Sequence, residues 1–251
     1  MRKARWIIGL ASILVLTAAG PAMADILPVG QWDLNEGTGT IANNDSPLTP
    51  DGTLSGGVSW TTGRFKGGLS FNGSNGVVDI PDNKLFEGAN VTVSAWVEAN
   101  GTPGDFKYIV GKGANGCCTG SYGLETGANG GLVFYVANST TTAIQSPDAG
   151  YSIWNGKWHN VIGTFDGSTV RLYVDGKQIG NGTPDTSPIQ YNLPTGNDLQ
   201  IGNYTACPQL GWIGDIDEVK VFNRALGSGE IALAYLASSL LPTASPFDLI
   251  L

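Results

Sequence analysis

The sequence has only one histidine, His159, in 251 residues. Histidine is the commonest side chain for proton transfer near neutral pH, and a polysaccharide lyase of the Tyr/His type or a catalytic cysteine would have only this one to use. Acid–base chemistry would therefore fall to carboxyl or tyrosine side chains, which the sequence alone does not single out. We assign no catalytic residue.

Basic residues are also few. The chain has 13 Lys and Arg against 21 Asp and Glu, which gives a formal net charge of −8. Such a surface argues against nucleic acid and against anionic membranes as partners. It is compatible with neutral glycans, or with divalent cations held by carboxylates.

Long hydrophobic runs are absent after the first residues, so no later segment is expected to span a membrane. The chain begins with three basic residues among its first five, then has an apolar run over residues 7–19 and the sequence Ala22-Met23-Ala24. This order is typical of a secretory signal peptide, which we place at residues 1–24. A membrane anchor is the alternative, but the run is shorter than the roughly 20 residues that a bilayer requires. We expect a secreted, periplasmic or cell-surface protein.

Cysteines number three, Cys117, Cys118 and Cys207. An exported chain favours one disulfide, and one thiol then remains unless it pairs with another chain. We expect a bridge between Cys207 and one of the adjacent pair, and take Cys118 as the partner, although the sequence leaves Cys117 open. A strained bridge between Cys117 and Cys118 is the alternative. The spacing matches no metal site.

Residues that favour tight turns are common in the sequence. Two Asp-Gly pairs, at residues 166–167 and 175–176, lie between β-rich runs and predict two consecutive hairpins. About a dozen strands are expected, separated by many of the 37 glycines and 13 prolines. One short helix is predicted near residues 228–237, capping an edge. We therefore predict an all-β fold, a two-sheet antiparallel sandwich with one short C-terminal helix.

One domain is expected over residues 27–238, because no repeat or low-complexity linker divides the chain. The tail, residues 239–251, is too apolar for a solvated terminus and too short to span a membrane. It either packs on the sandwich, is disordered, or serves as an attachment or sorting signal.

Several separated motifs resemble the laminin-G-like, concanavalin A-like jelly roll of bacterial secreted proteins. They are the segments from Trp32 to Thr40, Gly52 to Leu54, Gly63 to Gly73, Val91 to Val97 and Gly214 to Leu226, together with the Trp158-His159 hairpin. The resemblance spans about residues 29–237 and implies one convex and one concave sheet. The resemblance also implies that His159 is a core or interstrand histidine rather than a base. The superfamily includes lectins, glycoside hydrolases, polysaccharide lyases and adhesion domains, so fold alone does not fix activity.

A hydrolase related to this jelly roll places carboxylates on one face of a strand. The nearest string here is Asp215-Ile216-Asp217-Glu218, in which strict alternation puts Glu218 on the other face from the two aspartates. The triplet is therefore broken, and we expect more readily a binding protein than an enzyme.

The resemblance also implies a structural calcium ion between the first and last strands. We nominate Asp33, Asn72 and Asp217 as its ligands, since calcium prefers carboxylate, amide and carbonyl oxygens. The alternative is that Asp217 accepts backbone N–H groups and that Asn72 shapes the Asn72-Gly73 turn.

Sugars stack on exposed aromatic rings. Aromatic residues in or beside loops are candidates for this role, and we nominate Tyr151, Trp154, Tyr204 and Trp212. Together these features predict a non-enzymatic binding or adhesion module for polysaccharide or a glycosylated surface. The alternatives are a divergent glycoside hydrolase or polysaccharide lyase, and a scaffold that binds a protein partner.

Overall fold

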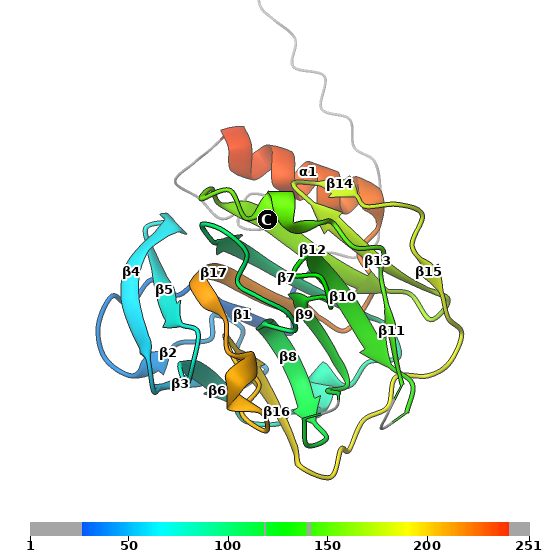
Figure 1. Ribbon diagram of the computed structural model, residues 1–251, viewed down its shortest axis with the longest axis horizontal. Helices are drawn as coiled ribbons and strands as arrows, with labels where there is room; N and C mark the ends of the chain where they lie inside the picture. Colours follow the sequence, from blue (N-terminus) through cyan, green and yellow to red (C-terminus); the bar gives the residue numbers. More distant parts are fainter. Residues whose placement is uncertain (1–26, 118, 140–141, 241–251) are drawn as a thin grey trace, which may run out of the picture.

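The computed structural model describes residues 27–117, 119–139 and 142–240. The predicted signal peptide, residues 1–24, lies outside these residues, as do Cys118 and residues 241–251 of the predicted tail. The described chain forms two antiparallel sheets packed face to face, with one helix at its C-terminal end (Figure 1).

The first sheet has nine strands, seven of which follow one another in the order β14-β13-β12-β7-β17-β5-β4, while β1 pairs with β17 and β15 with β13. Their bounds are β1 Gly30–Trp32, β4 Val58–Phe65, β5 Gly67–Asn72, β7 Val91–Glu98, β12 His159–Phe165, β13 Thr169–Val174, β14 Lys177–Gln178, β15 Thr183–Pro184 and β17 Ile213–Phe222. The long strands β7 and β17 lie side by side at its centre, so the C-terminal part of the chain is paired with its first half.

The second sheet has eight strands in the order β11-β10-β9-β8-β16-β6-β3-β2. Their bounds are β2 Ile41–Ala42, β3 Gly52–Ser55, β6 Val77–Ile80, β8 Tyr108–Ala114, β9 Tyr122–Thr126, β10 Leu132–Ala137, β11 Ala143–Gln145 and β16 Gly196–Ile201. Strands β8 to β11 are consecutive in sequence and form one half of this sheet, on which the candidate site lies.

Three short 3-10 turns and one α-helix complete the fold: η2 Lys84–Phe86, η3 Tyr151–Ile153, η4 Pro208–Leu210 and α1 Ser228–Leu240. The predicted meander is present as β12, β13 and β14. Its second turn has Asp175 at φ 50° and Gly176 at φ 74°, the left-handed backbone that an Asp-Gly hairpin turn supplies. The prediction of an all-β sandwich with one C-terminal helix is confirmed.

The core lies between the two sheets and is built from apolar side chains that alternate along the strands. Strand β7 is buried on both faces. One face meets the core, and the other lies under α1, where Trp96 stacks on Tyr235 at 6.2 Å. The helix thus covers the outer face of the nine-stranded sheet through a cluster of Ile162, Tyr173, Phe222, Leu226 and Ile231, rather than capping an edge.

Candidate functional site

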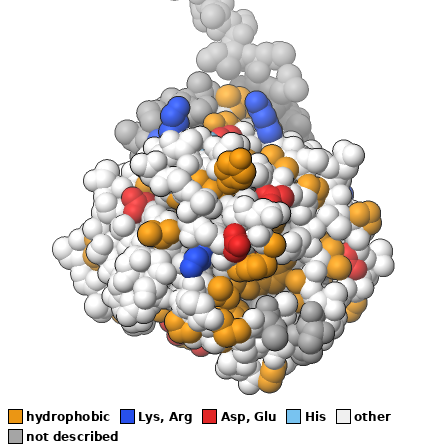
Figure 2. Space-filling view, viewed as in Figure 1, with side chains coloured by type: hydrophobic (Ala, Val, Ile, Leu, Met, Phe, Trp, Pro, Cys, Tyr) orange, Lys and Arg blue, Asp and Glu red, His pale blue; other side chains and the backbone are white. Residues whose placement is uncertain are grey.

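A pocket of about 420 Å³ lies on the outer face of the eight-stranded sheet, over strands β8 to β11. Hydrophobic side chains gather near the middle of this face in the space-filling view (Figure 2). The volume is within the range of about 300–1,000 Å³ that is usual for small-molecule sites. The lining residues are Phe106, Tyr108, Cys117, Thr119, Glu125, Tyr135, Ala143, Gln145, Cys207, Gln209 and Leu210.

Alternation along two neighbouring strands turns polar side chains outward. Leu124 on β9 and Phe134 on β10 belong to the core, so the next residues, Glu125 and Tyr135, face the opposite side of the sheet. The two strands are paired antiparallel, with Phe134 opposite Leu124. Pairing of β10 with β11 places Gln145 opposite Tyr135 at the edge of the sheet.

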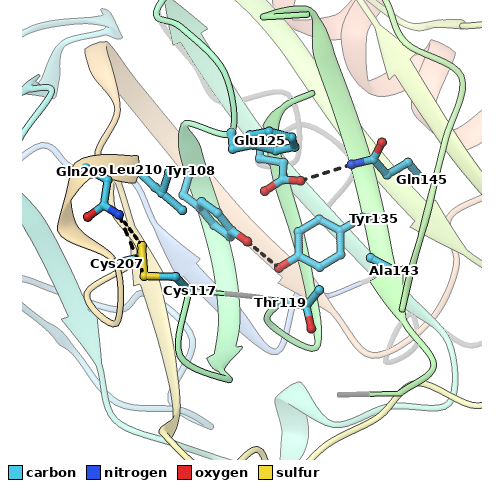
Figure 3. A pocket seen from close by; sticks show the side chains of 11 residues that line it. Tyr108, Cys117, Thr119, Glu125, Tyr135, Ala143, Gln145, Cys207, Gln209 and Leu210 are labelled. Carbon is cyan, nitrogen blue, oxygen red and sulfur yellow. Dashed lines mark hydrogen bonds between the residues drawn. A yellow bond between two sulfur atoms is a disulfide. The ribbon is translucent and has the colours of Figure 1, made fainter. Parts of the chain in front are cut away.

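Hydrogen bonds connect these outward side chains (Figure 3). The Tyr135 hydroxyl accepts from the backbone N–H of Gly120 at 3.1 Å and donates to the Tyr108 hydroxyl at 3.3 Å. The Tyr108 hydroxyl favours the ionised form of the Glu125 carboxyl and so acts to lower its pKa. From the other side, Gln145 Nε2 donates to Glu125 Oε1 at 3.4 Å. Donors from both sides therefore converge on one carboxyl group.

Burial sets the protonation of this group. Glu125 is 4% exposed, and loss of hydration raises its pKa from 4.5 to about 8, although the hydrogen bonds from Tyr108 and Gln145 act in the opposite direction. Burial also holds the pKa values of Tyr108 and Tyr135 well above their usual range. At neutral pH the pocket therefore contains a protonated carboxyl and two neutral phenols.

Aromatic packing fixes the floor of the pocket. Tyr108 stacks on Tyr204 with ring centroids 4.5 Å apart and meets the edge of Tyr135 at 6.2 Å. The Tyr204 hydroxyl accepts from the backbone N–H of Asn115 at 2.9 Å. Tyr204 is only 1% exposed, so it supports Tyr108 from behind and does not itself line the pocket.

A disulfide forms one wall. Cys117, in the loop after β8, is joined to Cys207, at the start of η4, and the two Cα atoms are 5.0 Å apart. The expected bridge to Cys207 is therefore present, but its partner is Cys117, not Cys118, and the bridge between adjacent cysteines is excluded. Cys117 is therefore the member of the adjacent pair that reaches Cys207.

The four nominated ligand-binding aromatics do not come together. Trp154 is 5% exposed and Trp212 fully buried; they pack edge to face at 5.2 Å in the core, so neither presents a ring to a sugar. Trp154 also donates to the carbonyl of Gly130 at 2.7 Å. Tyr151 is 71% exposed but lies in η3, outside the pocket, and Tyr204 lies beneath it. A position in a predicted loop was a poor guide to the exposure of these rings, because the loops fold back over the core.

Two of the nominated calcium ligands, Asn72 and Asp217, are also apart. Asn72 pairs with Ile213, four residues along β17 from Asp217, which is roughly 13 Å. Asn72 Oδ1 accepts from the backbone of Ser74 at 3.0 Å, and Asp217 Oδ2 accepts from that of Phe65 at 2.9 Å, which are the turn-shaping and strand-joining roles given above as the alternative. The described residues contain no group of three His, Cys, Asp or Glu side chains placed to hold a metal.

Two other sequence candidates have structural roles. A β-bulge between Asp217 and Lys220, with Glu218 at φ 53°, interrupts the alternation assumed for the Asp215–Glu218 string and buries both Asp217 and Glu218. Glu218 is paired with Lys220 at 2.6 Å. His159 bonds to Asp175 at 2.7 Å, which ties β12 to the second hairpin turn, as an interstrand histidine does.

The main site residues, Glu125, Tyr108, Tyr135 and Gln145, were not singled out from the sequence. The available signal was weak: Glu125 and Tyr135 occupy the outward positions of strands that were otherwise predicted. Sequence alone does not show that β8 to β11 are adjacent, nor that two loops cover this face.

In chemical terms the pocket offers apolar and aromatic surface, hydroxyl and amide groups, and one carboxyl. This set suits a ligand with both C–H faces and hydroxyl groups. Among the lining residues that the structure describes, Glu125 is the single carboxyl, so the pair of carboxyls required for glycoside hydrolysis is not assembled there.

Comparison with known families gives one match. The model of the concanavalin A-like lectin/glucanases superfamily matches residues 72–232. A search of curated protein sequences found no match. Among the helices of the described chain, none is long and apolar enough to cross a membrane.

Solved structures with a similar fold include three of interest. A Trypanosoma rangeli sialidase in complex with 2,3-difluorosialic acid is similar over 94% of this chain and 36% of its own, with a TM-score of 0.65 and 19% identity. Domain 4 of a GH43 extracellular arabinanase from Geobacillus stearothermophilus, in complex with arabinotriose, is similar over 82% of this chain and 96% of its own (TM-score 0.64, 16% identity).

The binding domain of botulinum neurotoxin serotype G is the third, over 85% of this chain and 51% of its own (TM-score 0.59, 14% identity). The chain thus spans about a third of the sialidase but almost all of the arabinanase domain. At these identities the likeness concerns the fold.

Proposed function

Because the chain belongs to the concanavalin A-like lectin/glucanase superfamily, we propose that it is a non-enzymatic carbohydrate-binding module whose ligand occupies the pocket over β8 to β11. The arabinanase domain, similar over nearly its whole length, was solved with an oligosaccharide, which supports a carbohydrate partner for this fold. The ligand is a polysaccharide or a glycosylated surface.

The observation that carries the proposal is the composition of the pocket. Tyr108 and Tyr135 are fixed by packing and by a hydrogen bond to each other, and Gln145 and Gln209 stand at opposite ends of the cavity (Figure 3). The two rings are 3% and 1% exposed, so they form a rigid floor, whereas Phe106, a lining ring that is 41% exposed, can meet the C–H face of a sugar. The two amide groups can bind its hydroxyl groups at low entropic cost.

The test is a glycan array followed by isothermal titration calorimetry, with arabinotriose as the first soluble probe. Gln145→Ala removes an amide from the pocket rim and should weaken binding about tenfold, the effect of losing roughly one hydrogen bond of 1–1.5 kcal/mol. The matched control is Gln178→Ala, which removes the same group from an exposed position on β14. Equal affinities in the two variants would place the ligand elsewhere, and no binding to any glycan would reject the proposal.

The second candidate is a glycoside hydrolase or polysaccharide lyase of the same superfamily. The observation in its favour is Glu125, since a buried protonated carboxyl is a suitable proton donor. The lack of a second carboxyl among the described lining residues weighs against a hydrolase. Release of products from a panel of polysaccharides, lost in Glu125→Gln, would establish the enzyme.

A scaffold that binds a protein is the third possibility. Its expected mark is an exposed apolar patch that includes the tail, and Leu233 and Leu236 on α1 are each more than half exposed. Most of the tail lies outside the described residues. Concentration-dependent self-association, or a protein partner whose binding is lost in a Leu233→Ser/Leu236→Ser variant, would support this reading.

Secretion is part of the proposal. Disulfides such as Cys117–Cys207 persist in oxidising compartments, which agrees with an extracellular protein. Residues 1–24 remain predicted as the signal peptide, and mass spectrometry of the exported protein should find a new N-terminus after Ala24.

A structural calcium ion also remains a prediction, now without the nominated triad. Oxygen-bearing side chains gather around Asp33 in a shallow hollow that also includes Asn35, Glu36, Asn43 and Asp45. The carboxyl groups of this hollow do not by themselves form a group placed to hold a metal, so amide and backbone oxygens would have to complete the coordination that calcium requires. A thermal unfolding midpoint that rises with calcium and falls with EDTA would support the ion, and identical midpoints would reject it.

A further inference from the structure

We propose that the pocket over β8 to β11 selects uncharged glycans and rejects glycans that carry carboxylate or sulfate groups, and that Glu125 sets this preference by donating its carboxyl proton to a ligand oxygen. The proposal rests on the proposed function and deepens it, because it names the ligand class and the specificity-determining residue of the same site.

The direction of the hydrogen bonds is the first argument. Gln145 Nε2 donates to Glu125 Oε1 at 3.4 Å, so this oxygen acts as an acceptor. The carboxyl proton is then carried by the other oxygen, and because Glu125 lines the cavity, an acceptor in the pocket can receive it. A sugar hydroxyl, ring or glycosidic oxygen provides one.

The charges around the pocket are the second argument. The described residues that line it include no Lys, Arg or His. The nearest cation along β8 and its preceding loop is Lys107, whose Nζ donates to the carbonyl of Gln209 at 2.5 Å, on the rim. An anionic ligand would have to be desolvated without a facing counterion, and it would approach a chain of net charge −8.

The groups that face Glu125 from the neighbouring elements should allow its carboxyl to titrate as a single group. They are Tyr108 from β8, Tyr135 from β10 and the uncharged Gln145 from β11, while the sulfur atoms of the Cys117–Cys207 wall do not titrate. Burial raises the pKa of Glu125 to about 8. As pH rises through this value the carboxyl loses the proton that the ligand accepts, so binding should weaken.

The experiment compares the full secreted chain at pH 6 and pH 9.5 on an array of matched neutral and acidic probes, such as lactose with 3′-sialyllactose and arabinotriose with a galacturonic acid trimer. Neutral probes should bind at pH 6, at least tenfold more tightly than their acidic counterparts. Their affinity should fall roughly 30-fold at pH 9.5, as expected for a group with a pKa near 8 that binds only when protonated. Preference for acidic probes, or equal affinity at both pH values, would overturn the proposal.

Variants separate this mechanism from a general effect of pH. Glu125→Gln keeps an N–H donor but cannot ionise, so the affinity that it retains for neutral probes should not change between pH 6 and pH 9.5. The matched control is Glu98→Gln. Glu98, at the end of β7 outside the pocket, also has a raised pKa, caused by burial and by Asp215, and its replacement should leave the pH dependence intact.

Two measurements keep the proposal falsifiable if Glu125→Gln does not fold. Tyr108→Phe removes a hydrogen bond that favours the ionised form of Glu125, so the midpoint of the binding curve should move to higher pH; a midpoint that stays or moves down contradicts the proposal. A ¹³C NMR titration of the Glu125 carboxyl needs no ligand and should show protonation near neutral pH. A carboxyl already ionised at pH 6 overturns this inference but leaves the proposed function standing, whereas a protonated carboxyl with no binding to any glycan overturns both.

Discussion

Each sheet carries a deeply buried carboxyl whose pKa is raised, Asp217 on the nine-stranded sheet and Glu125 on the eight-stranded sheet. Burial is the main cause of a pKa near 8 in both. Their partners differ. Asp217 Oδ2 accepts from the backbone of Phe65, which joins β17 to the end of β4, whereas Glu125 is bonded by side chains that line a pocket. A raised pKa alone therefore marks burial, and the groups that face the carboxyl distinguish a structural acid from a ligand-binding one.

The outer faces of the two sheets also differ in what covers them. On the nine-stranded sheet, α1 seals the surface with an apolar cluster around Ile231 and Phe222. On the eight-stranded sheet, the cover consists of two loops joined by Cys117–Cys207, and a cavity of about 420 Å³ remains beneath them. A helix with an apolar face packs without gaps, whereas loops held at one point leave space for a ligand.

The largest expected effect comes from opening the loop cover. Cys207→Ser removes the disulfide, which closes a loop with a sequence separation of 90 residues. Its loss should lower the free energy of unfolding by about 4 kcal/mol, through the entropy of the unfolded chain, and should weaken glycan binding by loosening one wall of the pocket. Urea unfolding and titration calorimetry measure the two effects. Unchanged affinity would mean that the disulfide serves stability alone.

The covered face should respond in stability only. Ile231 is fully buried between α1 and the nine-stranded sheet, and Ile231→Ala should cost about 3 kcal/mol of unfolding free energy through lost burial and a residual cavity. Glycan affinity should stay as in the native protein, because the two faces are separated by the core. A loss of binding in the folded variant would show that the faces are coupled.

The pH dependence of stability should separate the two acids. Between the ordinary pKa of an aspartate, 3.8, and the folded value of about 8, Asp217 is ionised in the unfolded chain and protonated in the folded one. Stability should therefore fall as pH rises through this window, by roughly 1.4 kcal/mol per pH unit for one such group. Urea unfolding from pH 5 to pH 8 should show a shallower fall in Asp217→Asn and no change in its glycan binding. The same slope in both proteins would refute the protonated state of Asp217.

The smallest effect is expected at the exposed ring outside the pocket. Tyr151 is 71% exposed, so Tyr151→Ala should change stability by no more than about 0.5 kcal/mol. We expect glycan affinity to be unchanged as well, since the residue does not line the pocket. A clear loss of affinity in calorimetry would restore Tyr151 as a ligand-binding residue and enlarge the site toward η3.

Much of the fold was predictable because it depends on local chemistry. The Asp-Gly pairs placed both hairpin turns of the β12–β14 meander. The site was far less predictable. Trp154 and Trp212 follow loop-like sequence yet pack in the core, and the bulge at Glu218 breaks an alternation that reads as regular. Burial of a loop and the position of a bulge depend on neighbours distant in sequence.

The sequence by itself determined an antiparallel β-sandwich and its single C-terminal helix, because turn residues and two-residue alternation act locally. It favoured a disulfide to Cys207 over the alternative between the adjacent cysteines, because three cysteines leave few choices. Only the tertiary structure decided that Cys117 is the bridged partner, that α1 seals one face, and that Glu125, Tyr108, Tyr135 and Gln145 meet on the other. These arrangements arise where four strands and two loops come together, and the order of strands in a sheet is set by packing over the whole chain.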